Sequence, residues 1–219
     1  MNHFQSDLNA PGAPLNVAPV LIAPHRACEI GREHPLRARV EDFIETRFRD
    51  AHGARISHFM PSLFAIFNKS GKVLAALGIR PASERLFLEY YLDQPIEALI
   101  AGLPLAADRP VQRDRLVEIG NLASIDRNAS LRLFRFLATY LIEQGFEWAS
   151  FTGGETLRRI FGLIGIETVS LGKASQERLP AGDRHWGRYY DDNPCILAGR
   201  VDSGRSLIAE HPVNAEVAA

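Results

Sequence analysis

The chain has 219 residues, of which 46% are hydrophobic and 23% charged, and its formal net charge is −1. A chain of this length can bury one sizeable core, so we expect a single domain. The balanced charge creates no field that would attract nucleic acid or anionic lipid, so we expect neither as a partner. The two cysteines, Cys28 and Cys195, are far apart in the sequence. This spacing argues against a structural zinc site or a disulfide framework and favours a reducing compartment.

The sequence shows no pattern typical of a membrane-spanning helix or of a secretion signal. No apolar run approaches the roughly 20 residues that a spanning helix needs. The N-terminus lacks a basic region followed by an apolar stretch, so we expect a cytoplasmic protein without a membrane span. Residues 1–18 are rich in Asn, Ala, Pro and Gly, and residues 203–219 show no periodicity either. We predict flexible tails at both ends of one domain, residues 19–202.

The first half of the chain mixes strand and helix patterns. Apolar residues at helical spacing, with charged residues opposite, indicate an amphipathic helix over residues 36–48. The patterns predict, in order, an edge strand at 20–23 before Pro24, the helix at 36–48 that Gly53 ends, a hairpin of strands 63–67 and 72–80, a strand at 86–92, and a helix capped by Asp93.

The second half predicts the remainder of a sheet. In order, it predicts a strand at 116–124, a helix at 131–144, a strand at 148–152, a helix at 155–163, and strands at 167–171 and 195–201. The helix at 131–144 has only a thin polar stripe, which indicates that it is mostly buried against a sheet. This order of elements predicts a mixed α/β sheet with helices on both faces.

One acid and one amide interrupt the apolar strand 116–124. Burying an ionisable group costs free energy unless the group is paired or hydrogen-bonded. Glu118 is therefore either a structural acid, paired with an arginine such as Arg80, or a general base or anchor for an acceptor amine. Asn121 either satisfies a bulge in the strand or hydrogen-bonds an acyl donor.

The segment after this strand, residues 125–130, is polar and precedes a helix. A helix start can hold a phosphate through free backbone N–H groups. Arg127 and Arg132 add positive charge, but the segment contains no glycine. This segment is either a phosphate cradle or a simple helix cap. The pair Gly153-Gly154 is predicted to form a tight turn between strand and helix, with an anion site as the second alternative.

Other polar and aromatic residues are candidates for an acceptor pocket. Arg80 and Glu89 lie near the ends of neighbouring predicted strands, where they either line a pocket or pair with each other as buried charges. Trp186, Tyr189 and Tyr190 form an aromatic cluster in a late polar segment. They either pack in the core or form a lid or a wall of a pocket. The seven histidines show no metal-ligand spacing, so no metal site is predicted.

Several segments carry a resemblance to known proteins: His58–Pro61, Gly78–Arg80, Leu86–Glu97, Val117–Ala123 and Trp186–Tyr190. In these segments the chain resembles the thermostable hemolysin family. More distantly, its layout is similar to the GCN5-related N-acetyltransferases and their autoinducer-synthase branch, in which an acidic motif of the form Glu-x-Ser-Arg precedes the same helix. Asn121 stands where that branch has arginine. The loop 126–130 lacks the glycines of the acetyltransferase pyrophosphate loop.

The resemblance implies a GCN5-related N-acetyltransferase-like fold and an acyltransferase. It implies no tightly bound cofactor, with acyl-CoA or acyl carrier protein as cosubstrate and a small-molecule amine as acceptor. Glu118 would be catalytic. Residues assigned to donor binding are Asn121, Leu122, Ala123, Arg127, Ser130, Arg132 and Thr152. Residues assigned to the acceptor pocket are Arg80, Glu89, Trp186, Tyr189 and Tyr190.

Three classes of function remain: an N-acyltransferase, a membrane-acting hemolysin, and a binding module that kept the fold but lost the chemistry. The second is disfavoured because the sequence has no basic amphipathic helix and almost no net charge. For the first, the strands containing Glu118 and Trp148 should run parallel and diverge at their C-terminal ends, forming a V-shaped cleft for the donor.

Overall fold

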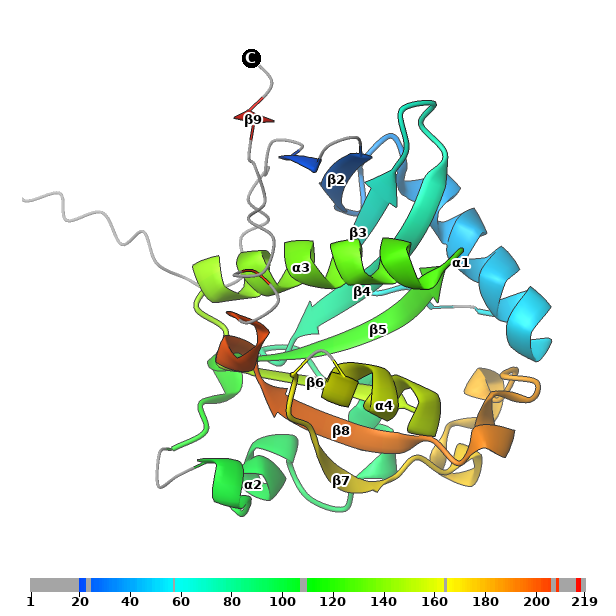
Figure 1. The fold of residues 1–219 in the computed structure, drawn as a ribbon. Coiled ribbons are helices and arrows are strands. Elements are labelled where there is room, and N and C mark those ends of the chain that lie inside the picture. The colour runs from blue at the N-terminus through cyan, green and yellow to red at the C-terminus, as the bar shows by residue number, and fades with distance from the viewer. Residues whose placement is uncertain are drawn as a thin grey trace, which may run out of the picture.

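A computed structural model describes residues 20–22, 25–56, 58–106, 110–163, 165–205, 208 and 216–217. The described strands form one sheet in the order β7-β8-β6-β5-β4-β3-β2-β1-β9 (Figure 1). Neighbours are antiparallel except β5 (Leu116–Ser124) and β6 (Trp148–Gly153), which are parallel. The predicted mixed α/β fold is confirmed. The predicted tail 1–18 and most of the tail 203–219 lie outside the described residues.

The predicted strands are present, except the one at 86–92. The other strands are β1 (Val20–Ile22), β2 (His25–Ile30), β3 (Ser62–Phe67), β4 (Val73–Pro81), β7 (Val169–Lys173), β8 (Cys195–Arg200) and β9 (Glu216–Val217). Strand β2 was not predicted, because Arg26 and Glu29 interrupt its apolar residues. Strand β9 was not predicted either, and it lies within the predicted tail 203–219. Strand β1 was predicted as an edge strand, but it pairs with both β2 and β9. Strand β7 begins two residues after the predicted start at 167.

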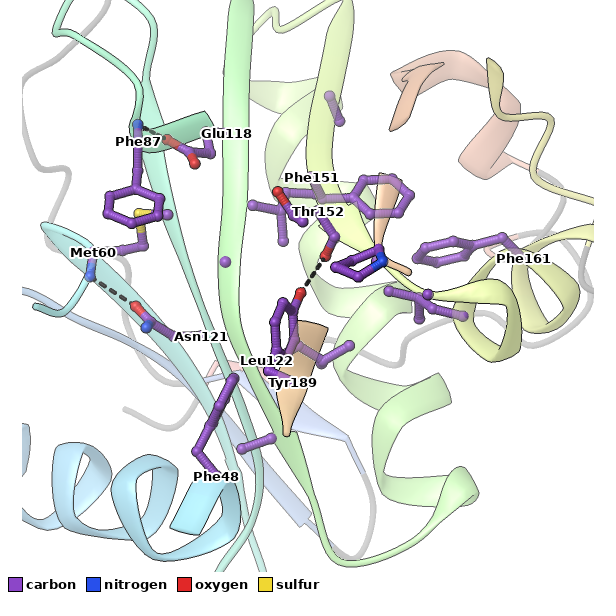
Figure 2. A pocket seen from close by; sticks show the side chains of 18 of the residues that line it. Phe48, Met60, Phe87, Glu118, Asn121, Leu122, Phe151, Thr152, Phe161 and Tyr189 are labelled. Carbon is purple, nitrogen blue, oxygen red and sulfur yellow. Dashed lines mark hydrogen bonds between the residues drawn. The ribbon is translucent and has the colours of Figure 1, made fainter. Parts of the chain in front are cut away.

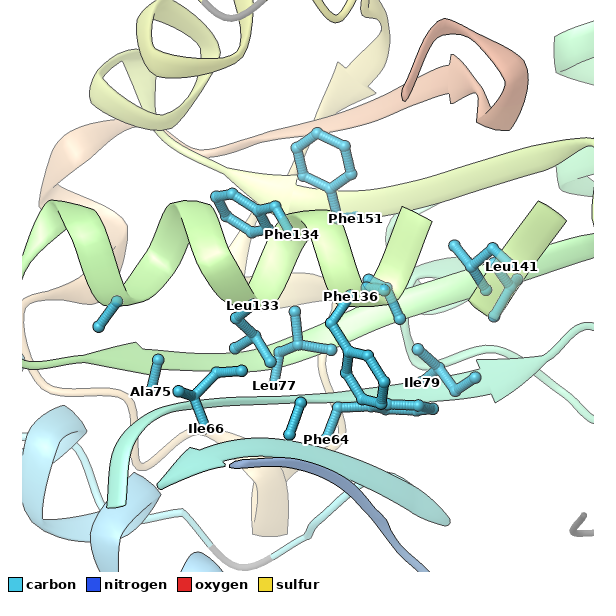
Figure 3. Close-up of a cluster of buried hydrophobic side chains, with 14 of the residues drawn as sticks. Phe64, Ile66, Ala75, Leu77, Ile79, Leu133, Phe134, Phe136, Leu141 and Phe151 are labelled. Atoms are coloured by element: carbon cyan, nitrogen blue, oxygen red, sulfur yellow. The ribbon is translucent and has the colours of Figure 1, made fainter. Parts of the chain in front are cut away.

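Helices cover both faces of the sheet (Figure 1). On one face lie α3 (Arg127–Glu143) and α4 (Glu155–Leu163), whose side chains share a buried cluster with β3, β4 and β6. Figure 3 shows Leu133 and Phe136 of α3 packed over Phe64 and Leu77. On the other face α1 (Arg37–His52) buries Val40 and Ile44. As predicted, Gly53 ends α1, with φ of 69°.

The segment predicted as a strand at 86–92 is instead a 3-10 helix, Phe87–Tyr91. The prediction was wrong because hydrogen bonds to a residue outside the segment determine its backbone conformation. The backbone N–H groups of Phe87 and Leu88 donate to the carboxylate of Glu118 rather than to a strand. Together with α2 (Ile96–Ala101), this segment covers the sheet beside β5, β6 and β8.

Two helix starts also differ from the prediction. Asp93 does not cap α2, whose N-cap is Pro95, because the Asp93 carboxylate forms an ion pair with Arg178 at 2.6 Å. Helix α3 begins at Arg127 rather than at residue 131. Its N-cap is Asp126, whose side chain accepts a hydrogen bond from the Ala129 N–H. The polar segment predicted as a loop is therefore mostly the first turn of this helix.

Candidate active site

The two parallel strands separate at their C-terminal ends. Their pairing runs from Leu116 opposite Trp148 to Ile119 opposite Phe151 and then stops. Beyond that point β5 continues to Ser124 beside β4, and β6 continues to Gly153 beside β8. The predicted divergence is confirmed. It leaves the facing edges of both strands without a strand partner, and we call this opening the fork.

A bulge bends β5 at the fork. The register between β4 and β5 shifts opposite Asn121, whose φ is 54°. The Asn121 side-chain oxygen accepts a hydrogen bond from the Met60 N–H at 2.8 Å (Figure 2). Of the two alternatives for Asn121, the structure supports the bulge, because its side chain already holds the segment before β3.

A cavity of about 560 Å³ lies at the fork (Figure 2). Residues from both faces of the sheet line it. On the face covered by α1 these include Glu118 and Phe87, and on the face covered by α3 and α4 they include Leu137, Phe151 and Phe161. The cavity therefore passes through the fork and joins a polar chamber to an apolar one.

Glu118 lies at the polar end of the cavity and is only 4% exposed. Its carboxylate accepts two backbone hydrogen bonds, from Phe87 at 2.7 Å and from Leu88 at 3.0 Å. Burial raises the pKa of Glu118 to about 7, although these two amides and the positive charge of Arg80 act to lower it. A carboxyl group with this pKa exchanges a proton readily near neutral pH.

Arg80 lies directly opposite Glu118 on β4. The described residues contain no ion pair between the two side chains; Arg80 donates one long bond, 3.4 Å, from Nη1 to the Arg85 carbonyl. Its Nε is buried and has no hydrogen-bond partner. The structural alternative for Glu118, a salt bridge with Arg80, is therefore not formed, and backbone amides hold the acid instead.

An aromatic wall encloses the polar chamber. The Tyr190 and Tyr91 hydroxyl groups lie 2.5 Å apart, and the ring of Trp186 contacts both Phe87 and Tyr190. The Tyr189 hydroxyl donates to the Thr152 carbonyl at 3.2 Å, which satisfies a backbone group on β6 that the fork leaves without a strand partner (Figure 2). Of the alternatives for this cluster, the structure supports a wall of the cavity.

This wall is fastened to the end of α1. The Arg188 N–H donates to the His52 carbonyl at 2.8 Å, and the Arg55 N–H donates to the His185 carbonyl at 2.7 Å. Between them Gly187 has φ of 54°, and a Cβ at this position would overlap the His52 carbonyl. Only glycine allows this close approach without strain.

Most of the predicted site residues meet at the cavity. Those that line it are Arg80, Glu118, Asn121, Leu122, Ala123, Thr152, Trp186, Tyr189 and Tyr190. Those that do not line it are Glu89, Arg127, Ser130 and Arg132.

Two of the four residues outside the cavity have structural partners. Glu89 forms an ion pair with Arg113 at 2.7 Å and accepts the Leu86 N–H, so it holds the 3-10 helix rather than an acceptor. It is not at a strand end, because the strand predicted at 86–92 does not form. Ser130 donates its hydroxyl to the Asp126 carbonyl at 3.2 Å. At the start of α3 the structure supports the helix-cap alternative, since the Asp126 carboxylate occupies the place of an anion.

Several cavity residues were not among the predicted site residues. They are Phe48, His52, Met60, Phe87 and Tyr91 on one face, and Leu157, Ile160 and Phe161 of α4 on the other. Phe48 and His52 are four residues apart on α1, so they share one helix face. That spacing was visible in the sequence, but nothing in it indicated that the face meets the segment 185–190.

Comparisons with known proteins give a family match and solved structures with the same fold. The family model described as "Thermostable hemolysin" matches residues 30–205. A search of curated proteins found no match. Solved structures with the same fold include the acyl-homoserine lactone synthase LasI, with a TM-score of 0.59, 12% identity, and coverage of 84% of this chain and 95% of that one.

Two further structures are similar over nearly their whole length. MesI, a CoA-dependent acyl-homoserine lactone synthase, has a TM-score of 0.57 and 14% identity, with coverage of 88% of this chain and 98% of that one. FeeM, an N-acyl amino acid synthase from uncultured soil microbes, has a TM-score of 0.56 and 16% identity, with coverage of 86% and 98%. At these identities the similarity establishes the fold.

Proposed function

The chain belongs to the thermostable hemolysin family, and from this premise and its cavity we propose that it is an acyltransferase that moves an acyl group from a thioester carrier to an amine. One observation carries the proposal. A single cavity passes through the fork, with Glu118 at one end and an apolar chamber at the other. Glu118 is the only buried carboxylate among the residues that the structure describes.

The acyl chain of the donor would occupy the apolar chamber between α3 and α4. Phe134, Leu137, Phe151 and Phe161 supply this chamber with apolar surface, and burial of each methylene of the chain contributes about 0.8 kcal/mol. The thioester would then lie in the fork. There the unpaired edge of β5 offers backbone N–H groups to a developing oxyanion.

The amine would attack from the chamber that holds Glu118. The ionised carboxylate accepts a proton from the ammonium group, and the neutral amine adds to the thioester carbonyl carbon. The tetrahedral intermediate expels the carrier thiolate, which takes up a proton to become a thiol. The products are an amide, a thiol and one proton released to solvent through Glu118. General base catalysis of this kind contributes typically 10²–10⁴-fold to a rate.

The carrier would be acyl-CoA or an acylated carrier protein. MesI, which shares the fold, is CoA-dependent. The start of α3 lacks glycine and carries the acidic cap Asp126, so a phosphate would be held there by arginine side chains more than by backbone amides. We assign this role to Arg127 and Arg132, and we favour a fatty acyl carrier over acetyl-CoA because apolar side chains, among them Leu137 and Phe161, line the chamber.

Direct membrane lysis is the alternative that the family name suggests. In the described part of the chain, no helix has the length and apolar character needed to cross a membrane. No feature of the cavity favours lysis over transfer.

The test is thiol release from a panel of acyl-CoA thioesters and acylated carrier protein, in the presence of mixed primary amines. Glu118→Gln should lower kcat by about 10²-fold or more while the protein stays folded. The wild-type rate should rise with pH and level off above about 7, where Glu118 is ionised. Glu29→Gln is the matched control, because Glu29 is partly buried and also has a raised pKa but does not line the cavity.

Full turnover by a folded Glu118→Gln variant would remove Glu118 from the mechanism. Bound acyl thioester without turnover would indicate a binding module.

A further inference from the structure

Arg80 lies directly across the strand pair from the buried acid, but no ion pair joins the two side chains among the described residues. The Arg80 Nε is buried without a hydrogen-bond partner, and the bond from Nη1 to the Arg85 carbonyl is 3.4 Å long. A buried donor left unsatisfied costs roughly 1–3 kcal/mol, and more when it is charged. A ligand in the cavity that supplies a hydrogen-bond acceptor would satisfy the Arg80 Nε.

The position of Arg80 restricts what that ligand can be. Arg80 and Glu118 are direct cross-strand partners, so their side chains leave the sheet side by side, and both line the cavity. Side chains of directly opposed residues start about 5 Å apart. A ligand that touches both can therefore carry its anionic group and its amino group close together, as an α-amino acid does.

We propose that the acceptor is an α-amino acid with an apolar or aromatic side chain, whose carboxylate Arg80 binds while its amino group faces Glu118. This inference rests on the proposed acyltransferase function. A guanidinium group matches a carboxylate with two parallel hydrogen bonds, and this geometry would satisfy the unpaired Nε.

Charge favours a zwitterion over a simple amine. A simple amine enters as a cation and would lie next to the positive Arg80 in a poorly hydrated chamber, where repulsion is strong. An amino acid brings a carboxylate that neutralises Arg80, and its ammonium group then faces only the carboxylate of Glu118.

The walls of the chamber select the side chain. Around Glu118 they are formed by the rings of Phe87, Tyr91, Trp186 and Tyr190, and the hydroxyl groups of the two tyrosines already bond to each other. These rings offer apolar and edge contacts to an aliphatic or aromatic side chain. Among the charged residues, Arg80 and Glu89 influence the pKa of Glu118, and the negative Glu89 would disfavour a carboxylate side chain there.

The experiment compares matched ligands on the intact protein in the presence of CoA. Binding of L-phenylalanine, L-phenylalaninamide and 2-phenylethylamine, and of L-leucine and 3-methylbutylamine, is measured by titration calorimetry. The same compounds then serve as acceptors in the thiol-release assay. The two amino acids should bind at least about tenfold more tightly than the three ligands without a carboxylate, as expected for one buried charge pair.

Variants then assign the effect to Arg80. Arg80→Gln should remove this preference while leaving affinity for 2-phenylethylamine unchanged or improved, and Arg80→Lys should restore part of it. Arg85→Gln is the matched control, because Arg85 is nearby but stacks on the Tyr90 ring at 4.5 Å outside the cavity. The wild-type comparison of ligands needs no variant, so a misfolded Arg80→Gln protein does not block the test.

The outcomes separate the two proposals. Equal binding of amino acid and decarboxylated amine, absence of amino acid binding, or a preference that survives Arg80→Gln would overturn the inference. Transfer that is equally fast to amines without a carboxylate would also overturn it and leave the acyltransferase function intact. Arg80-dependent amino acid binding with no turnover of any donor would keep the site and refute the transferase.

Discussion

The buried carboxyl group of Glu118 should make the stability of the protein depend on pH. Burial raises its pKa to about 7, from an ordinary value of 4.5. The folded state therefore binds this proton more tightly than the unfolded state. The contribution of Glu118 to the free energy of unfolding should be highest below about pH 4.5 and should fall as the pH rises from there to about 7, by at most about 3 kcal/mol.

Glu118→Gln carries no charge at any pH, but its Nε2 cannot accept the second of the two backbone N–H groups that Glu118 holds. We therefore expect the stability of the variant, relative to wild type, to be higher at pH 8 than at pH 5. Urea unfolding of both proteins at the two pH values measures this difference. A variant that is less stable by the same amount at both pH values would show that the buried carboxylate does not titrate as described.

The sequence indicated some of these residues and not others. An acid within the apolar strand 116–124 stood out because burial of a charge needs a reason, and the same logic singled out Asn121. The unsatisfied Nε of Arg80 could not be predicted, because it depends on the Glu118 carboxylate being occupied by the amides of Phe87 and Leu88. Those amides are presented by a segment whose backbone the sequence pattern misassigned.

At the scale of elements, two glycines allow Met60 to lie on the bulged strand pair. Gly78 and Gly120 are cross-strand partners on β4 and β5. A Cβ at Gly120 would lie 2.5 Å from the mobile end of the Met60 side chain, Cε, whereas a Cβ at Gly78 would overlap the Met60 Cβ itself. Met60 in turn donates its N–H to Asn121, so this contact sets the shape of the fork.

The two glycines should therefore respond differently to a second substitution. Gly78→Ala and Gly120→Ala should each destabilise the protein by about 1–3 kcal/mol through overpacking. Adding Met60→Ala should recover much of the loss for Gly120→Ala, since it removes the clashing Cε. It should recover little for Gly78→Ala, where the clash is with Cβ. Thermal melts of the four variants test this, and equal recovery in both pairs would contradict the geometry.

The elements were predictable where local chemistry decides them. The hairpin of β3 and β4, the end of α1 at Gly53 and the parallel β5–α3–β6 unit follow from turn residues and periodicity. The strand expected at 86–92 failed because contacts with Glu118, remote in sequence, override an apolar pattern. The start of α3 was placed late because the polar residues 127–130 were taken for a loop rather than for a capped first turn.

The start of α3 also supports a prediction about the carrier. If Arg127 and Arg132 hold its phosphates, affinity for CoA should fall clearly between low and moderate salt, because exposed charge pairs are screened within about 10 Å at 0.1 M. The double variant Arg127→Ala/Arg132→Ala should bind more weakly and depend less on salt. Arg49→Ala, which removes an exposed positive charge from α1, is the control. Tight binding that is insensitive to salt and survives the double substitution would assign the carrier to another surface.

At the scale of the whole molecule, the two faces of the sheet divide the proposed reaction. The acceptor end is polar and aromatic and lies under α1, while the donor end is apolar and lies under α3 and α4. An acyl chain joined to an amino acid would be a product with an anionic head and an apolar tail. Such a product is a surfactant, which offers an indirect route to lysis by an enzyme that has no spanning helix among its described residues.

The depth of the apolar chamber should set the preferred acyl length. Ala138 of α3 lines the chamber, and the backbone of Gly204 approaches it so closely that a Cβ there would lie 3.0 Å from the Ala138 Cβ. Ala138→Phe would place a ring in the chamber and shorten it. We expect kcat/KM to fall by about 10²-fold for long-chain donors, while short-chain donors keep most of their rate, because each methylene that loses its site forfeits about 0.8 kcal/mol.

Thiol release across a series of donors from two to twelve carbons measures this ratio. Thr139→Phe is the control, since Thr139 is the next residue on α3 and does not line the cavity. An unchanged profile of chain lengths in a folded Ala138→Phe variant would mean that the acyl chain does not enter between α3 and α4.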